Sequence, residues 1–406
     1  MKINRILLIF LIFLVIVGIV GTIFSEGLIS NTPLEPKENA SIAVTGDVMF
    51  ARNMAGVLSL DSSPFSGVSN VTSNVDLLLI NFENAATYSE NVVKGDVPLK
   101  CSPEYVPLAK ANNNTVAALA NNHAFDYGIG GMQDTVKYLK DAGITPIGAG
   151  NSEDEAHQAV VKDINGRKIT ILNYMDADNF AEYPYEVIPY ANGSNPGYSA
   201  YDYEAASKQI SENNDSDLII AYMHFGNEYS VSPNENQVKM AHELIDLGAD
   251  VVIGCHPHVT QGIEMYNGKP IFYSLGNFIF DQSNPATHTS YFLNLALHED
   301  NCTVTLYPTY LSSYLPHFMD AESGKALINV LNPHSDQLKV NDDGTGELTF
   351  KLGNNTLNAT LDVGNNWTYT FVGLDKFANG TNAIAKALAD NEDATTIIGG
   401  GDSAAA

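Results

Sequence analysis

Residues 216–258, SDLIIAYMHFGNEYSVSPNENQVKMAHELIDLGADVVIGCHPH, contain the pattern that decides the fold. The apolar run at 216–226 is typical of a buried strand, and residues 236–248 have the spacing of an amphipathic helix. A second apolar run follows at 249–258. A strand, a helix and a further strand in this order predict an α/β protein with a largely parallel sheet. Both apolar runs end in histidine, which raises the question of what these imidazoles do.

The same alternation continues through most of the chain. We expect a helix at 130–143 and further strands at 41–46, 75–83, 115–123, 166–175, 269–280 and 290–308. The run at 166–175 is typical of the second arm of a hairpin, so antiparallel pairing is also expected. Two packed mixed sheets flanked by helices fit this pattern, within one domain at 40–332. Alternating polar and apolar residues then predict a small β-rich appendage at 333–390, and a disordered tail follows at 391–406.

The N-terminus carries a long apolar segment. Lys2 and Arg5 precede an uncharged run at 6–24, which is close to the roughly 20 residues of a membrane-spanning helix. This length favours an uncleaved signal-anchor at 1–26, with a linker at 27–39, over the alternative of a cleaved signal peptide. Because positive residues stay inside, we expect a single-pass protein of the cell membrane with its main domain outside the cell.

Charge and cysteine content exclude some functions. The 406 residues include 20 basic and 47 acidic side chains, a formal charge of -27, which argues against binding to nucleic acid. An anionic substrate would need a local positive centre, such as a bound metal. Cys101, Cys255 and Cys302 are too few and too far apart for a disulfide framework, although one disulfide stays possible outside the cell.

Polar side chains that bind metals gather where the expected strands end. They are Asp47, Glu83, Asn122, His123, Asp126, His224, His256, His258 and Asn277. Because ligands bind at the carboxyl ends of parallel strands, we expect these groups to converge at one edge of the sheets. The mixture suits one or two divalent ions, since imidazole favours zinc or iron and carboxylate admits manganese.

Taken singly, several of these residues have simpler explanations. His224 alone is more often a satisfied polar residue than a ligand, and Asp126 alone is typical of a turn rather than of a group that orients His123. His256 and His258 form a more specific pair. Residues i and i+2 of an extended chain point to the same side, so both rings are expected to face one site.

Six motifs in order complete the pattern: TGDVMFAR, NFENAAT, LANNHAFDYG, HFGNEY, GCHPHVTQ and YSLGNFIFDQ. Together they resemble the CapA family, the poly-γ-glutamate capsule synthesis proteins, from about residue 41 to about residue 320. The resemblance implies a four-layer α/β/β/α sandwich, similar to the calcineurin-like metallophosphoesterases, in which strand-end residues hold two metals.

The resemblance also implies roles for individual residues. The metal ligands would be Asp47, Glu83, Asn122, His224, His256 and His258, with Glu83 as the bridging carboxylate. His123 would be the catalytic proton donor or transition-state stabiliser, and Asp126 is the second candidate catalytic residue, three positions later. The superfamily pattern has a histidine two residues after the first aspartate, but Met49 stands there, so one metal lacks an imidazole.

These features predict a membrane-anchored, exported protein of capsule or poly-γ-glutamate biosynthesis. Its site would be a metal-dependent hydrolase or transferase centre for an anionic polymer or a phosphoester. The alternative is a non-enzymatic subunit that guides the polymer or organises other capsule synthesis subunits in the membrane.

Overall fold

The computed structural model describes residues 38–177, 187–331, 337–352, 356–362 and 368–374. The expected anchor at 1–26, most of the linker and the tail at 391–406 lie outside these ranges. Within the described ranges, no helix has both the length and the apolar character needed to cross a membrane.

Two sheets form the centre of the domain. The strands of the larger sheet, in spatial order, are β19 (Lys339–Val340), β20 (Gly346–Lys351), β17 (Asn301–Ser312), β16 (Thr289–Leu297), β1 (Ala40–Val48), β2 (Leu77–Phe82), β5 (Thr115–Ala118) and β6 (Thr145–Ile147). Two more strands join it, β15 (Asn277–Ile279) beside β1 and β18 (Leu315–Phe318) beside β17. The smaller sheet contains β13 (Ile263–Tyr266), β14 (Lys269–Phe272), β12 (Val251–Cys255), β11 (Leu218–His224), β9 (Arg167–Met175) and β8 (Val160–Ile164).

The remaining described elements are short pairs of strands and helices. The pairs are β3 (Ala85–Ala86) with β4 (Lys100–Cys101), β7 (Ala149–Gly150) with β10 (Gly197–Tyr198), and β21 (Thr356–Asp362) with β22 (Thr368–Leu374). The α-helices are α2 (Met54–Val57), α3 (Ser69–Thr72), α4 (Gly128–Asp141), α5 (Glu153–Ala156), α6 (Tyr203–Glu212), α7 (Glu235–Leu247) and α8 (Ala321–Leu331). The 3-10 helices are η1 (Ser66–Val68), η2 (Pro103–Ala109) and η4 (Pro285–His288).

The two sheets pack face to face because their strands are apolar on both sides. Ile42 and Val44 of β1 share one buried core with Ile220 of β11 and Ile253 of β12. The intervening Ala43 faces the opposite way and packs in a second core. Successive strand residues therefore fill two different apolar layers, which explains why these strands appear as continuous apolar runs.

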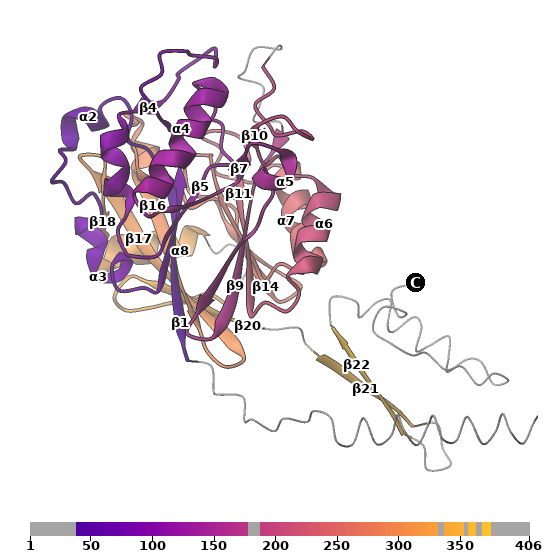
Figure 1. Cartoon of the computed structure of the whole chain (residues 1–406). Coiled ribbons are helices and arrows are strands. Elements are labelled where there is room, and N and C mark those ends of the chain that lie inside the picture. Colours follow the sequence, from indigo (N-terminus) through magenta and orange to yellow (C-terminus); the bar gives the residue numbers. More distant parts are fainter. Residues whose placement is uncertain (1–37, 178–186, 332–336, 353–355, 363–367, 375–406) are drawn as a thin grey trace, which may run out of the picture. The chain divides into compact units, whose positions relative to one another are not determined.

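Helices cover both outer faces. Met132 and Leu139 of α4 pack on the outer face of the larger sheet, whereas Ile210 of α6 and Leu244 of α7 pack on the smaller one. Figure 1 shows α4 on one side of the strands and α6 and α7 on the other. The mixed α/β fold predicted from the sequence, two sheets flanked by helices, is confirmed.

The segment 216–258 folds as expected into β11, α7 and β12. Asn234 caps α7 in a capping box with Gln237, and Gly248 ends the helix in the left-handed conformation at φ 117°. The chain then returns parallel to β11, with His224 opposite Cys255. The local sequence signals thus place the carboxyl ends of β11 and β12 side by side, with His224 at the end of β11 and His256 directly after β12.

The main domain extends beyond the boundary that was expected at residue 333. β20 is antiparallel to β17, and its Leu348 and Phe350 join the core between the sheets. The first part of the expected appendage therefore adds a strand to the main sheet. It does so because β20 pairs with the edge of β17 and its apolar side chains cover the layer between the sheets. The pair β21 and β22 is β-structure, as the alternation predicted.

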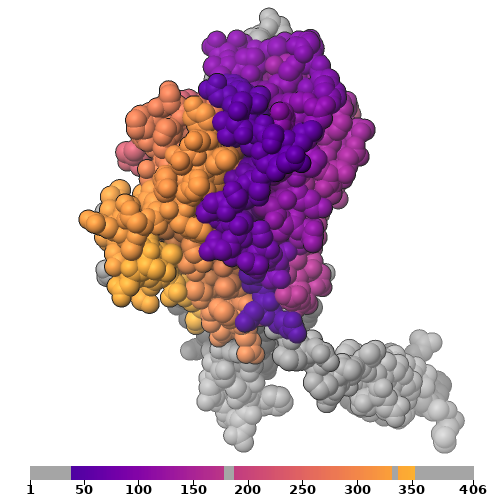
Figure 2. Space-filling view, turned by 90° about the vertical axis from the view of Figure 1, so that its left-hand side faces the viewer, coloured from indigo at the N-terminus to yellow at the C-terminus, as the bar shows by residue number. Residues whose placement is uncertain are grey.

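Segments far apart in the sequence also meet on the outer surface. In Figure 2 the indigo residues after β1 lie beside the orange residues near β18. An added Cβ at Gly67 of η1 would come within 2.3 Å of the Pro316 carbonyl oxygen in β18. The early and late parts of the domain are therefore closely packed here.

Gly46 has a special position just before Asp47. A Cβ atom at Gly46 would lie 1.8 Å from the carbonyl oxygen of Gly276, and Asp47 N donates to that same oxygen at 3.2 Å. This close approach aligns Asp47 with Asn277 in the pairing of β1 and β15. A side chain at position 46 would push these two strands apart.

We expect Gly46→Ala to destabilise the domain by about 1–3 kcal/mol, because the backbone must move to remove the clash. Urea unfolding of the full chain measures the change. Gly130→Ala is the matched control, since Gly130 lies in α4 with no described atom within 4 Å of an added Cβ. Equal midpoints for Gly46→Ala and wild type would show that the close approach is not required.

Candidate functional site

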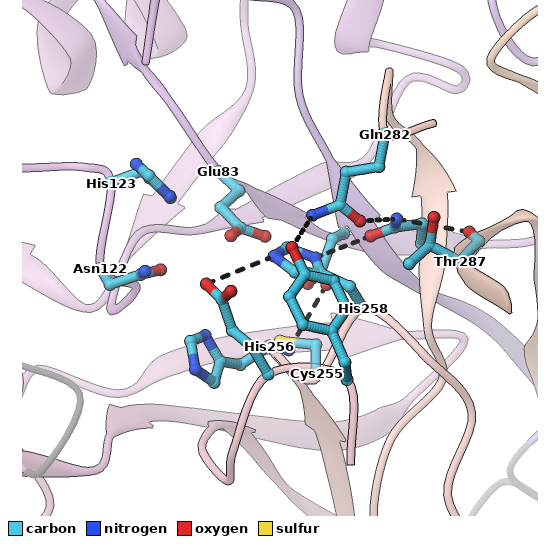
Figure 3. Close-up of polar contacts among 12 residues, drawn as sticks. Glu83, Asn122, His123, Cys255, His256, His258, Gln282 and Thr287 are labelled. Carbon is cyan, nitrogen blue, oxygen red and sulfur yellow. Dashed lines mark hydrogen bonds and ion pairs between the residues drawn. The ribbon is translucent and has the colours of Figure 1, made fainter. Parts of the chain in front are cut away.

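The carboxyl ends of the central strands bring the expected residues into one buried cluster. Asp47 and His224 lie at the carboxyl ends of β1 and β11, and Glu83 directly follows β2. Asn122 follows β5, and His256 and His258 follow β12. All of these residues are buried. Figure 3 shows the labelled side chains of Glu83, Asn122 and His258 directed toward a common space.

Potential metal ligands form two adjacent groups. In the first, one ligand atom from each of Asp47, Glu83 and His258 lies within 4.8 Å of the others. In the second, His224 Nε2 is 2.9 Å from Asn122 Oδ1 and 2.9 Å from His256 Nδ1. The six residues assigned as ligands from the motifs therefore all enter the site, three in each group.

Two asparagines that the sequence analysis did not select hold the carboxylates in place. Asn81 Nδ2 donates to Asp47 Oδ1 at 2.8 Å and to Glu83 Oε2 at 3.1 Å. Asn121 Nδ2 in turn donates to Asn81 Oδ1 at 2.9 Å. Both residues lie within the recognised motifs NFENAAT and LANNHAFDYG, but only the contacts across strands reveal what they do.

Burial keeps most of the site uncharged in the metal-free protein. Burial, followed by the charge of Asp47, raises the pKa of Glu83 well above its usual range. Burial and the neighbouring His258 lower the pKa of His256 to about 3, and burial with His256 lowers that of His224 well below its usual value. The imidazoles of His224 and His256 are therefore neutral, the form that binds metals.

Asp47 and His258 are the exception. Burial raises the pKa of Asp47, but the hydrogen bond and charge of His258 outweigh it, so the pKa is lowered. Burial lowers the pKa of His258, and the hydrogen bond and charge of Asp47 reverse this effect. The two groups, 3.4 Å apart between Oδ2 and Nδ1, form a buried ion pair.

The donor atoms fit a divalent cation. Glu83 Oε1 is buried and has no hydrogen-bond partner among the described residues, which is costly for an oxygen in this setting. Imidazole nitrogens, carboxylates and an amide oxygen together suit a borderline transition metal. Met49 contributes nothing to the site, since it packs in the apolar core and its sulfur accepts from Ala51 N at 2.8 Å.

Cys255 is a further candidate that the sequence analysis did not assign. Its sulfur forms a third possible ligand group with Asp47 and His224, and it lies 3.3 Å from His224 Nδ1. Burial, followed by the charges of Asp47 and Glu83, raises the pKa of the thiol well above its usual value. All three cysteines are free and buried, so the disulfide left open by composition does not form.

His123 and Asp126 form a hydrogen-bonded pair at the edge of the ligand groups. His123 Nδ1 is 2.8 Å from Asp126 Oδ2, and Leu99 N donates to the same oxygen at 2.6 Å. The structure therefore places Asp126 where it orients His123, not in an isolated turn.

Lys94 adds a cation that no sequence pattern indicated. Its side chain is 1% exposed, and Nζ lies 3.0 Å from the Asn122 carbonyl oxygen and 3.3 Å from His123 Nδ1. It comes from the loop between β3 and β4, where the sequence has neither helical nor strand periodicity. Asp126 Oδ1 lies 3.9 Å from Nζ, so this buried lysine is paired with the carboxylate that also contacts His123.

The expected extended geometry of the two final histidines is wrong. β12 ends at Cys255, and His256 and His258 have φ values of 98° and 60°, which non-glycine residues rarely adopt. Their ring centroids are 6.1 Å apart, and the two rings belong to different ligand groups. Asn277 Oδ1, 2.9 Å from His258 Nδ1, holds one of them. Such backbone strain is common at functional sites.

Comparison with known proteins gives consistent relatives. The family described as bacterial capsule synthesis protein PGA_cap matches residues 41–282. The PGA biosynthesis protein CapA of Bacillus subtilis (strain 168) is 34% identical over 324 residues, covering 77% of this chain and 82% of that protein. The capsule biosynthesis protein CapA of Bacillus anthracis is 32% identical over 285 residues, covering 67% of this chain and 68% of that protein.

Structural similarity is weaker than sequence similarity. Vps29 of Chaetomium thermophilum is 11% identical, with a TM-score of 0.31, covering 79% of this chain and 99% of that chain. A score this low carries no argument about this chain, so the family assignment rests on the sequence matches. The match at 41–282 includes every expected ligand from Asp47 to His258. The chain belongs to the family of bacterial capsule synthesis proteins of the PGA_cap type, as its six motifs predicted.

Proposed function

We propose that this protein acts in capsule or poly-γ-glutamate biosynthesis through a metal-dependent hydrolase or transferase site. The observation that carries the proposal is the convergence of six donor residues, from the ends of five strands, on one buried space. A helix cap or a turn accounts for any one of these residues, but it does not account for all six lying in one cluster. The names of the Bacillus relatives support the polymer context, and the motifs' likeness to calcineurin-like metallophosphoesterases supports the reaction class.

Two ions would be held by the two ligand groups. Asp47, Glu83 and His258 would hold one, and Asn122, His224 and His256 the other, and the family resemblance assigns Glu83 as the carboxylate shared between them. Zinc, iron and manganese all suit such a donor set. When bound, these ions would acidify a water molecule and polarise the phosphorus or carbonyl centre under attack.

The protein's own residues would manage the proton and the substrate charge. In its imidazolium form, His123 would donate from Nδ1 to Asp126 and pass the proton on Nε2 to the leaving group, which leaves a neutral ring with its hydrogen on Nδ1. Asp126 is thus a positioning residue, and His123 is the catalytic one. Lys94 would draw an anionic substrate toward a protein whose formal charge is -27.

We also propose that the apolar run at 6–24 anchors the protein in the cell membrane with the domain outside. The length of the run and the basic residues before it support this topology. The partners would then be the membrane itself and other subunits of the polymer synthesis machinery. A purely organising role is the rival that the experiments below separate.

Replacing His256 and His258 together with alanine should remove the bound metal. We expect about one to two transition metal ions per wild-type chain and close to none in the double variant, measured by elemental analysis of the purified full chain. His242→Ala is the control, because His242 pairs with Glu264 and stacks on Tyr266 outside the site. A double variant with wild-type metal content would refute the ligand assignment.

His123→Gln should impair chemistry without loss of metal. We expect turnover to fall about 10²- to 10⁴-fold, the usual contribution of a positioned general acid. The assay is a panel of phosphoester and γ-glutamyl substrates, with metal content measured in parallel. Wild-type turnover in the variant would rule out His123 as the proton donor.

The variant Asp47→Asn, tested in cells, distinguishes the enzymatic role from the organising role. The change removes a ligand charge yet keeps the side-chain shape, so it should abolish polymer while the protein still reaches the membrane. Asp215→Asn, at an exposed ion pair with Lys168, is the control. Normal polymer with Asp47→Asn would favour the organising role.

A further inference from the structure

The first ligand group has room for a further donor. A catalytic metal site usually combines at least three protein ligands with a water molecule and can expand to five ligands, and Asp47, Glu83 and His258 provide three residues. The motif likeness would supply an imidazole from position 49, but Met49 is fully buried in the apolar core. The unpartnered Glu83 Oε1 indicates that this part of the site is built for a cation.

We propose that Glu228 completes this position as a fourth protein ligand in place of the missing imidazole. The inference rests on the proposed function, because it adds a ligand to the same metal site. Glu228 lies in the HFGNEY motif, four residues after His224, but the strand-end pattern did not select it.

The hydrogen bonds of His258 determine which of its nitrogens binds metal. Asn277 Nδ2 donates to Gln282 Oε1 at 2.9 Å and to the Thr287 carbonyl oxygen at 3.3 Å, so Oδ1 is the Asn277 atom that faces the ring. Figure 3 labels Gln282 and Thr287 beside His258. An amide oxygen only accepts, and therefore Nδ1 carries the hydrogen and Nε2 is the ligating nitrogen in the metal-bound site.

Glu228 faces this ligating nitrogen. Its Oε1 lies 4.0 Å from His258 Nε2. Two donors bound to one ion at about 2.0–2.2 Å each are at most about 4.4 Å apart, so both atoms fit the same ion without large movement. The Glu228 side chain is 35% exposed, whereas that of His258 is 2% exposed. Glu228 therefore approaches from the open side of the site.

Backbone contacts hold Glu228 in this place. Phe225 N donates to the Cys255 carbonyl oxygen at 3.2 Å, and Tyr229 N donates to the Pro257 carbonyl oxygen at 2.8 Å. The loop after β11 is thus tied on both sides of Glu228 to the segment that carries His256 and His258. Tyr229 itself has a φ of 61°, a second rare conformation beside the site.

Manganese binding tests this assignment. The full chain is stripped of metal and titrated with Mn²⁺ alone, and stoichiometry and affinity are measured for the wild type, Glu228→Gln, Glu228→His and the control Glu235→Gln. Glu235 is an exposed residue of the first turn of α7. We expect Glu228→Gln to weaken binding at one position about 10- to 100-fold, Glu228→His to bind more tightly than Glu228→Gln, and the control to match the wild type.

The outcomes distinguish this inference from the proposed function. Wild-type stoichiometry and affinity in Glu228→Gln would overturn the assignment of Glu228 and leave the metal site intact. The wild type is also titrated separately with Zn²⁺ and with Fe²⁺, and a wild type that binds none of the three ions would overturn the metal site itself. Thermal unfolding of the metal-free variants checks the fold, and equal midpoints with weaker binding in Glu228→Gln support ligation.

Discussion

The packing of the two sheets against each other is the constraint on which the site depends. Val44 of β1 and Ile220 of β11 share the apolar layer between the sheets. Tyr222 Oη crosses this layer and donates to the Thr45 carbonyl oxygen at 2.6 Å. Asp47 and His224 each lie two residues beyond this contact. The distance between groups from opposite sheets is therefore fixed by apolar packing, which tolerates little change.

Burial then decides the chemistry of the groups that this packing brings together. Glu83 has its pKa raised and His224 has its pKa lowered, in each case first by burial, so both resist ionisation. Holding such groups close together and away from water has an unfavourable free energy, which opposes folding unless another interaction compensates for it. A divalent cation would do so, because it favours the carboxylate form and accepts the imidazole lone pairs. This compensation is the physical basis of the proposed metal site.

Loops provide the groups that the strands do not. Lys94 comes from the loop between β3 and β4, and Glu228 comes from the loop after β11. One is a buried cation beside His123, and the other is a partly exposed carboxylate beside His258. They lie near different ligand groups, so the two proposed metal positions differ in charge and in access.

Local sequence patterns determined the strands, the helices and the positions at which strands end. Apolar runs reported buried strands, glycine and the capping box marked the end and the start of α7, and polar residues just after the runs predicted a site containing Asp47, Glu83 and His224. These signals are local, because each depends on neighbouring residues and on a repeat of two or 3.6.

Only the tertiary structure decided which groups meet. Three features of the structure have no periodic pattern in the sequence. They are the left-handed backbone at His256 and His258, the asparagines that hold the carboxylates, and the addition of β20 to the main sheet. The sheets, packed face to face, bring together atoms that lie up to about 200 residues apart, such as Asp47 and His256. Such contacts depend on the packing of whole layers, which a short stretch of sequence does not encode.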